Sequence, residues 1–336
     1  VLEGLREREA AGILPPTFVV EKVLAEMRAF TGAPAKENIL YASFLEKLDK
    51  LPAGTLKDGE REALLAKVET AVTGQVYPAY GQFIAYYDAL LPKTTGNHGV
   101  WALPDGAAFY AWAARQHTST DMTPAQIHQL GLDEVARIEA EMDAILVAEG
   151  LVEGSVGARI QQISKRPEQL YPDNDEGRAA IIADFTRIIT EADASLDPYF
   201  NVRPKQGVKV ERVPEFREKT APGAYYNTPA MDGSRPGIFY INLRNTDEVA
   251  RFGMRTLAYH EAIPGHHFQT TIQQELSGVP TFRKILGFTA FPEGWALYTE
   301  RLAWEIGLQK EPLDNLGRLQ AEMFRAVRLV VDTGMH

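Results

Sequence analysis

The chain of 336 residues is 45% hydrophobic and 24% charged, the composition of an ordinary globular protein. It holds no cysteine, which excludes thiol nucleophiles, thiolate metal sites, iron–sulfur clusters and disulfides. Its net charge of -10 disfavours general binding of nucleic acid, because an acidic surface repels phosphate backbones. No apolar run approaches the roughly 20 residues that would cross a bilayer.

Helical periodicity dominates the first part of the chain, where apolar residues recur every three or four positions. The clearest helix start lies at Thr123, because Pro124 occupies the first helical position and Gln126 completes a capping box. The predicted helices cover 18–30, 37–51, 59–72, 76–91, 107–116, 123–149 and 175–196.

The segment 201–243 has a different pattern. Residues 208–213 alternate between apolar and polar side chains, which is typical of a strand, and 224–226 and 238–243 are two further short strand candidates. Because helices are predicted on both sides of this segment, we expect a mainly α fold with a small inserted β-sheet (α+β).

The rest of the chain again predicts helices, from about residue 247 to residue 331. Loops are expected near 278–280 and 291–292, and a helix break is expected near 333–334. Since no linker composition divides the chain, we predict a single mainly helical domain over 1–336. The chain starts at Val1 and stops just after the predicted break, so we expect this domain to be part of a longer protein without its leader.

The stretch most typical of an active site is Tyr-His-Glu-Ala-Ile-Pro-Gly-His-His-Phe-Gln, residues 259–269. Zinc hydrolases often place two histidine ligands one helical turn apart, with a glutamate after the first as general base. Here the position four residues after His260 is Pro264, so the simple pattern is interrupted. In an unbroken helix His266 would lie about 9 Å further along the axis than His260.

The interrupting residues predict how the second histidine returns to the site. Pro264 has no N–H for the carbonyl of residue 260, and Gly265 tolerates unusual backbone angles, so we predict a two-residue bulge. Phe268 begins the buried face of the following helix. By helical phase His266 lies about 200° from Phe268 and His267 about 100°. We therefore predict His266 as the ligand and keep His267 as the alternate ligand or a substrate contact.

The third ligand is predicted in Phe-Pro-Glu-Gly-Trp-Ala-Leu-Tyr-Thr-Glu, residues 291–300. Pro292 indicates a helix start, which puts Glu293 in the first turn. Gly294 is expected to let another backbone approach closely. Glu300 lies two turns further on the same face, where its carboxylate would orient a ligand histidine.

These motifs resemble the gluzincin metallopeptidases, in which a Glu-Gly-aromatic-Ala segment follows a His-Glu-x-x-His helix. The longer signature His-Glu-x-x-Pro-Gly-His-His, together with 235–237, 293–300 and 328–336, is similar to the bacterial DUF885 family. The resemblance covers about Thr94 to His336. It implies a zinc-dependent hydrolase with the helical fold of the wider MA clan. It also implies relatives that are longer than this chain and often exported, as periplasmic or lipid-anchored proteins.

The predicted metal ligands are His260, His266 and Glu293, with Glu261 as the general base that accepts a proton from water and passes it to the leaving amine. A peptidase also needs a donor for the oxyanion. The sequence does not rank the candidates for this donor, which are Tyr225, Tyr226, Tyr240 and His336. The strand 238–243 is expected to offer its backbone to an extended peptide.

Three charged residues share one side of the last predicted helix: Arg325, Arg328 and Asp332. An arginine there would bind a substrate carboxylate in bidentate fashion and favour carboxypeptidase or dipeptidase activity. Alternatively, these residues would form a structural ion network with Glu322.

The predicted function is a zinc peptidase that acts on a peptide or small amide. One alternative is a zinc hydrolase of esters or non-peptide amides, and the other is a non-catalytic metal-binding protein of the same fold. An intact Glu261 favours an enzyme, because a protein that only binds has no need of the base. The sequence leaves the oligomeric state open.

Overall fold

The computed structural model describes the backbone of residues 1–336 and all side chains except that of Phe216. The chain divides into two compact units, residues 1–110 with Met335–His336 (unit 1) and residues 111–334 (unit 2). The sequence predicted one domain. The boundary falls inside helix α6 (Gly106–Thr118), so no linker composition marks it.

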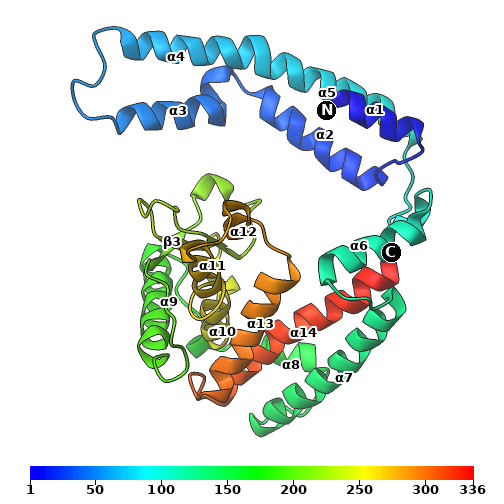
Figure 1. Cartoon of the computed structure of the whole chain (residues 1–336), viewed down its shortest axis with the longest axis vertical. Helices are drawn as coiled ribbons and strands as arrows, with labels where there is room; N and C mark the ends of the chain where they lie inside the picture. Colours follow the sequence, from blue (N-terminus) through cyan, green and yellow to red (C-terminus); the bar gives the residue numbers. More distant parts are fainter. The chain divides into compact units, whose positions relative to one another are not determined.

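Unit 1 is built of helices packed along their lengths (Figure 1). Its α-helices are α1 (Leu2–Ala10), α2 (Thr17–Gly32), α3 (Ile39–Asp49), α4 (Glu60–Ala71) and α5 (Tyr77–Leu90). A π-helical turn, Val72–Val76, joins α4 to α5. Val20 and Leu24 of α2 meet Leu90 of α5 in a small buried cluster.

Unit 2 carries most of the remaining helices. They are α7 (Pro124–Ala148), α8 (Val156–Ser164), α9 (Asp175–Ser195), α10 (Arg251–Glu261), α11 (His266–Glu275), α12 (Thr281–Ile285), α13 (Ala290–Glu305) and α14 (Pro312–Met335). Short 3₁₀ turns occur in both units, at Ala35–Glu37, Leu91–Lys93, Val100–Ala102, Pro167–Gln169, Glu215–Arg217 and Thr246–Glu248.

The predicted helices of the first part are confirmed, with ends shifted by at most two residues, and Thr123 and Gln126 form the predicted capping box. Helices α1 and α8 were not predicted. The predicted break near 333–334 is wrong, because α14 continues to Met335. Thr333 lies within this helix, and its hydroxyl donates to the carbonyl of Leu329 at 2.6 Å.

A three-stranded mixed sheet lies in unit 2, in the predicted segment. Strands β1 (Val208–Arg212), β2 (Ala224–Asn227) and β3 (Gly237–Ile241) are ordered β1-β3-β2, with β1 parallel and β2 antiparallel to β3. The fold is therefore mainly α with a small inserted sheet, as predicted. However, β3 is paired on both edges, so its backbone is not open to a peptide as the sequence analysis expected; the open edges belong to β1 and β2.

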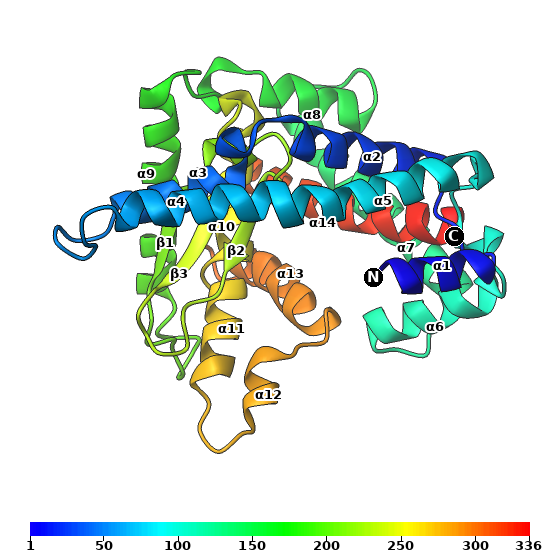
Figure 2. The ribbon, with the colours of Figure 1, turned by 90° about the horizontal axis from the view of Figure 1, so that it is seen from above.

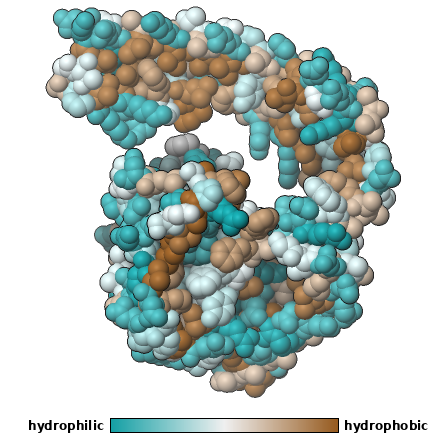
Figure 3. All heavy atoms as spheres, in the orientation of Figure 1, coloured by the Kyte–Doolittle hydropathy of each residue, from teal (hydrophilic) through white to brown (hydrophobic). Residues whose placement is uncertain are grey.

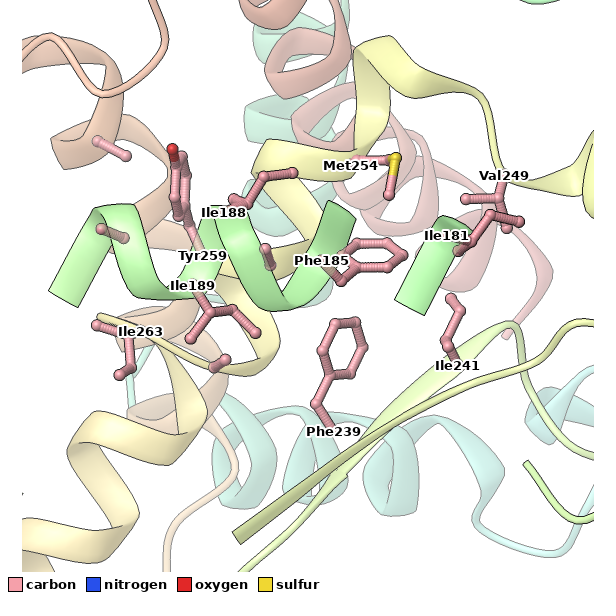
Figure 4. Close-up of a cluster of buried hydrophobic side chains, with 14 of the residues drawn as sticks. Ile181, Phe185, Ile188, Ile189, Phe239, Ile241, Val249, Met254, Tyr259 and Ile263 are labelled. Carbon is pink, nitrogen blue, oxygen red and sulfur yellow. The ribbon is translucent and has the colours of Figure 1, made fainter. Parts of the chain in front are cut away.

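The main core of unit 2 lies between α9, the sheet and α10. Phe185 of α9 meets Phe239 of β3 edge to face, with ring centroids 5.1 Å apart, and Tyr259 and Ile263 extend the same cluster (Figure 4). Figure 2 shows the strands beside α9, α10 and α11. This packing fixes the end of α10, from which the predicted site begins. Among the described residues, no helix is both long and apolar enough to cross a membrane.

Candidate metal centre

The break between α10 and α11 replaces the predicted bulge within one helix. Helix α10 ends at Glu261, and α11 starts at His266. The Phe268 N–H donates to the carbonyl of Ala262 at 3.3 Å, six residues back rather than the four of a regular helix. The two extra residues are present as predicted, but they interrupt the helix instead of forming a bulge within it.

Gly265 is required at this break by close packing. A Cβ atom at Gly265 would lie 1.9 Å from the carbonyl oxygen of His260 and 2.2 Å from that of Tyr259. The neighbouring carbonyl of Pro264 accepts a hydrogen bond from the Trp295 indole N–H at 2.8 Å. Helix α13 thereby holds the break in place, a role of Trp295 that the sequence analysis missed.

The break brings together the side chains predicted as ligands. One nitrogen each of His260 and His266 and one carboxylate oxygen of Glu293 all lie within 4.8 Å of one another. Glu293 Oε2 is 3.7 Å from His260 Nε2, and Glu293 Oε1 is 3.8 Å from His266 Nε2. The two imidazole rings meet edge to face, with centroids 4.7 Å apart.

This donor set fits a zinc ion. Two imidazole nitrogens and one carboxylate oxygen are a known ligand set of catalytic zinc. Zinc bonds of about 2.0–2.1 Å in a tetrahedron imply ligand atoms about 3.3 Å apart, close to the 3.7 and 3.8 Å between Glu293 and the two imidazoles. Burial lowers the pKa values of His260 and His266 to about 4, so both rings are neutral near pH 7, as ligands must be.

Glu300 and Arg325 lie behind His260. Glu300 Oε1 is 2.7 Å from His260 Nδ1, and Arg325 Nη2 is 3.1 Å from the same oxygen. Arg325 Nη2 also lies 2.9 Å from His260 Nδ1. A guanidinium only donates, so when Nδ1–H donates to Glu300, Arg325 pairs with Glu300 alone. That tautomer leaves the Nε2 lone pair of His260 directed to Glu293.

His267 lies on the opposite side of the break and is fully buried. Its Nε2 is 2.9 Å from the carbonyl oxygen of Gln206, to which it donates, and its Nδ1 is 2.9 Å from the Tyr226 hydroxyl. A Cβ at Gly237 would lie 2.6 Å from Nδ1, so this contact needs the glycine. With both ring nitrogens bound by protein groups, the geometry favours His266 over His267 as the ligand.

Glu261 ends α10 next to the ligands and is about nine-tenths buried. No hydrogen bond to its carboxylate is formed among the described residues. Burial, reinforced by the charge of Glu293, raises the pKa of Glu261 to about 7. A carboxyl with this pKa both accepts and releases protons near neutral pH, the property of a general base that later acts as an acid.

The other predicted site residues lie in different surroundings. Tyr225 stacks on Tyr240 across the sheet, with ring centroids 5.0 Å apart, and Tyr226 binds His267. The Arg328 guanidinium lies over the Phe324 ring. None of these contacts involves the three candidate ligands.

Two more predicted residues lie near the end of the chain. His336 belongs to unit 1, where its Nδ1 accepts a hydrogen bond from the Val100 N–H at 3.0 Å. Asp332 is exposed on α14.

Two expectations about neighbouring residues need correction. The structure pairs Glu322 with Arg137 and Arg318 rather than with Arg325. No backbone lies close to Gly294, because a Cβ there would meet nothing within 4 Å. Glu293 itself lies in the first turn of α13, as predicted.

An apolar groove of about 650 Å³ lies on the side of α11 and α13 away from the ligands. Phe268 and Trp295 line it, each two positions along its helix from a candidate ligand and therefore on the opposite face. Figure 3 shows hydrophobic side chains at the surface around α11 and α12, where Leu286 and Phe288 are 69% and 74% exposed. The groove is thus separate from the candidate centre.

The fold and this cluster define a mainly helical protein with a small mixed sheet and a three-donor centre at a helix break. The chain belongs to the family DUF885, described as bacterial protein of unknown function, whose model matches residues 1–336. None of the curated proteins is similar enough to match the sequence.

The solved structures that are similar to the chain include two putative lipoproteins. One is a putative lipoprotein from Colwellia psychrerythraea, with 39% identity and a TM-score of 0.95 over 98% of this chain. The other, a putative lipoprotein of unknown function from Shewanella oneidensis, has 18% identity and a TM-score of 0.66 over 96% of this chain, and shows the fold alone. This chain spans little more than half of each, 56% and 57%.

Proposed function

We propose that the protein is a zinc-dependent peptidase in which His260, His266 and Glu293 hold the ion and Glu261 is the general base. The observation that carries the proposal is the convergence of three donor atoms within 4.8 Å beside a buried carboxyl without a hydrogen-bond partner among the described residues. His260 and Glu261 are both buried, which is costly for polar groups without a use, whereas Glu293 stays 57% exposed.

Bound zinc would lower the pKa of a water molecule and polarise the scissile carbonyl. The positions of the protein side chains indicate their roles in the reaction. Glu261 accepts the proton of the attacking water and donates it to the leaving amine, since its pKa near 7 permits both steps. Glu300 holds the Nδ1–H of His260, and Arg325 balances the charge of Glu300.

An extended substrate would find an open strand edge close to these helices. Strand β2 is an edge strand, and it packs against both α10 and α11. Its unpaired edge offers backbone donors and acceptors to a peptide by strand addition. This feature supports peptides over small esters as substrates.

The similarity to the Colwellia protein, which is described as a putative lipoprotein, supports export of this protein as well. We propose that the protein acts outside the cytoplasm. Fractionation of the native host would test this, with the protein expected in the membrane or periplasmic fraction and a cytoplasmic location contradicting it.

The decisive test of the peptidase proposal is Glu261→Gln in zinc-loaded protein. Loss of the base is expected to lower turnover of a cleaved peptide by about 10²–10⁴-fold. Zinc content, measured by elemental analysis, is expected to stay unchanged. Glu153→Gln, in an exposed loop of the same unit, is the matched control and should keep full turnover. Full activity of Glu261→Gln would rule out its role, and a panel of ester substrates tested beside the peptides would reveal a different hydrolase.

A further inference from the structure

A second cavity of unit 2, of about 490 Å³, opens beside Glu261. It runs along α10 from Gly253 to Glu261 and is closed by the start of β2, the end of β3 and Gln320 of α14. Eight residues of helix span about 12 Å. An extended peptide covers that length with three or four residues, at about 3.3–3.6 Å each.

The ionisable side chains that line this cavity are all acidic. Its lining contains three carboxylates, Asp247, Glu248 and Glu261, and no lysine, arginine or histidine. Glu248 is paired with Arg244 at 3.0 Å. Asp247 is exposed at the rim and forms no ion pair among the described residues. Glu261 is nine-tenths buried at the inner end without a hydrogen-bond partner in the described part of the chain.

The walls between these carboxylates are largely apolar. Met254 and Leu257 line the cavity from α10, Phe185 lines it from α9 and Ile241 from β3. Such walls fit a hydrocarbon stem, and an unpaired carboxylate at the rim fits a cation at the end of that stem. Lysine and arginine side chains combine these two properties.

Resting on the proposed peptidase function, we infer that this cavity binds a lysine or arginine side chain of the substrate. The position of Glu261 at its inner end places that basic residue within about three residues of the scissile bond. Asp247 is the specificity-determining residue, because it is the carboxylate of the lining that neither serves as the base nor is paired with an arginine.

The test uses the zinc-loaded protein and peptides with blocked ends, in which one lysine is moved along the sequence and compared with norleucine, glutamine and glutamate. We expect kcat/KM to be about tenfold higher with lysine at one position, as one charge-assisted contact allows. Asp247→Asn should abolish that preference by lowering kcat/KM for the lysine peptide to the level of the norleucine peptide. Asp121→Asn, whose side chain is 93% exposed, is the matched control.

A binding measurement separates this inference from the proposed function. Calorimetry with Nα-acetyl-lysine methylamide and its norleucine analogue needs no turnover. About tenfold tighter binding of the lysine compound, lost in Asp247→Asn, would support the cavity as a cation site even if no peptide were cleaved. Equal binding of the two compounds, or cleavage without preference for a basic residue, would overturn the inference. A preference that requires a free α-amino group would overturn it too, since the cation would then be the peptide terminus.

Discussion

The two sides of the helix break at residues 262–265 use the same side chain in opposite ways. On one side, His260 and His266 direct ring nitrogens to Glu293, and His260 is oriented by Glu300. On the other side, both ring nitrogens of His267 form hydrogen bonds, one with the Gln206 carbonyl and one with the Tyr226 hydroxyl. The role of each histidine therefore depends on whether neighbouring elements bind its ring nitrogens, rather than on its order in the motif.

The largest expected difference between the two sides is in zinc affinity. His266→Ala removes one of three donors and is expected to weaken zinc binding by more than about 100-fold, since loss of an outer partner alone costs 10–100-fold. His267→Ala should leave zinc affinity within about threefold of the wild type, because it touches no donor atom. Competition with a chromophoric chelator measures both. The reverse order would make His267 the ligand.

For the free energy of unfolding, we expect His267→Ala to have the larger effect and His266→Ala the smaller one. His267→Ala removes the imidazole that binds the Gln206 carbonyl and the Tyr226 hydroxyl and opens a cavity, at an expected cost of about 2–4 kcal/mol in the free energy of unfolding. In the presence of a chelator, His266→Ala should cost less than about 1 kcal/mol, because its ring is held by no comparable pair of bonds. Urea unfolding followed by circular dichroism tests this pair. Equal losses would remove the distinction between the two sides.

A third prediction concerns Glu300, which accepts the Nδ1–H of His260. Burial raises the pKa of Glu300 to about 8. Glu300→Gln keeps the shape but cannot become the carboxylate that accepts the Nδ1–H, so zinc affinity is expected to fall about 10–100-fold. Glu305→Gln, at the exposed end of the same helix, is the control and should have no effect on affinity. An unchanged affinity in Glu300→Gln would mean that Arg325, not Glu300, sets the tautomer of His260.

The smallest effects concern the two glycines next to the ligands. Gly265→Ala should destabilise the protein by about 1–3 kcal/mol and weaken zinc binding, because the new methyl group would collide with backbone carbonyls. Gly294→Ala meets open space inside α13 and should stabilise the protein by about 0.5–1 kcal/mol. Thermal unfolding of the two variants side by side is sufficient. A tolerated alanine at 265 would contradict the account of the break.

Local patterns predicted most of the elements. The capping box at Thr123 and the period-two run at 208–213 gave correct helix and strand starts. Helix α8 was missed although Val156, Ile160 and Ile163 have helical spacing, because it is only nine residues long. The boundary between the two compact units lies within a continuous helix, where no local composition marks it.

The sequence predicted the candidate ligands and Glu300, but not the contacts that hold them in place. Helical phase singled out His266, and the two-turn spacing from Glu293 singled out Glu300, because both arguments use periodicity alone. The contacts of Arg325 with Glu300, of Trp295 with Pro264 and of His267 with Gln206 join residues far apart in the chain. No local pattern encodes such contacts, so they required the structure.

The most direct test of the central claim is anomalous diffraction at the zinc edge from crystals of the protein grown with zinc. We expect one strong peak bounded by His260 Nε2, His266 Nε2 and a carboxylate oxygen of Glu293, with the His267 ring still hydrogen-bonded to Gln206. A peak at His267, or three separated side chains with no peak between them, would contradict it.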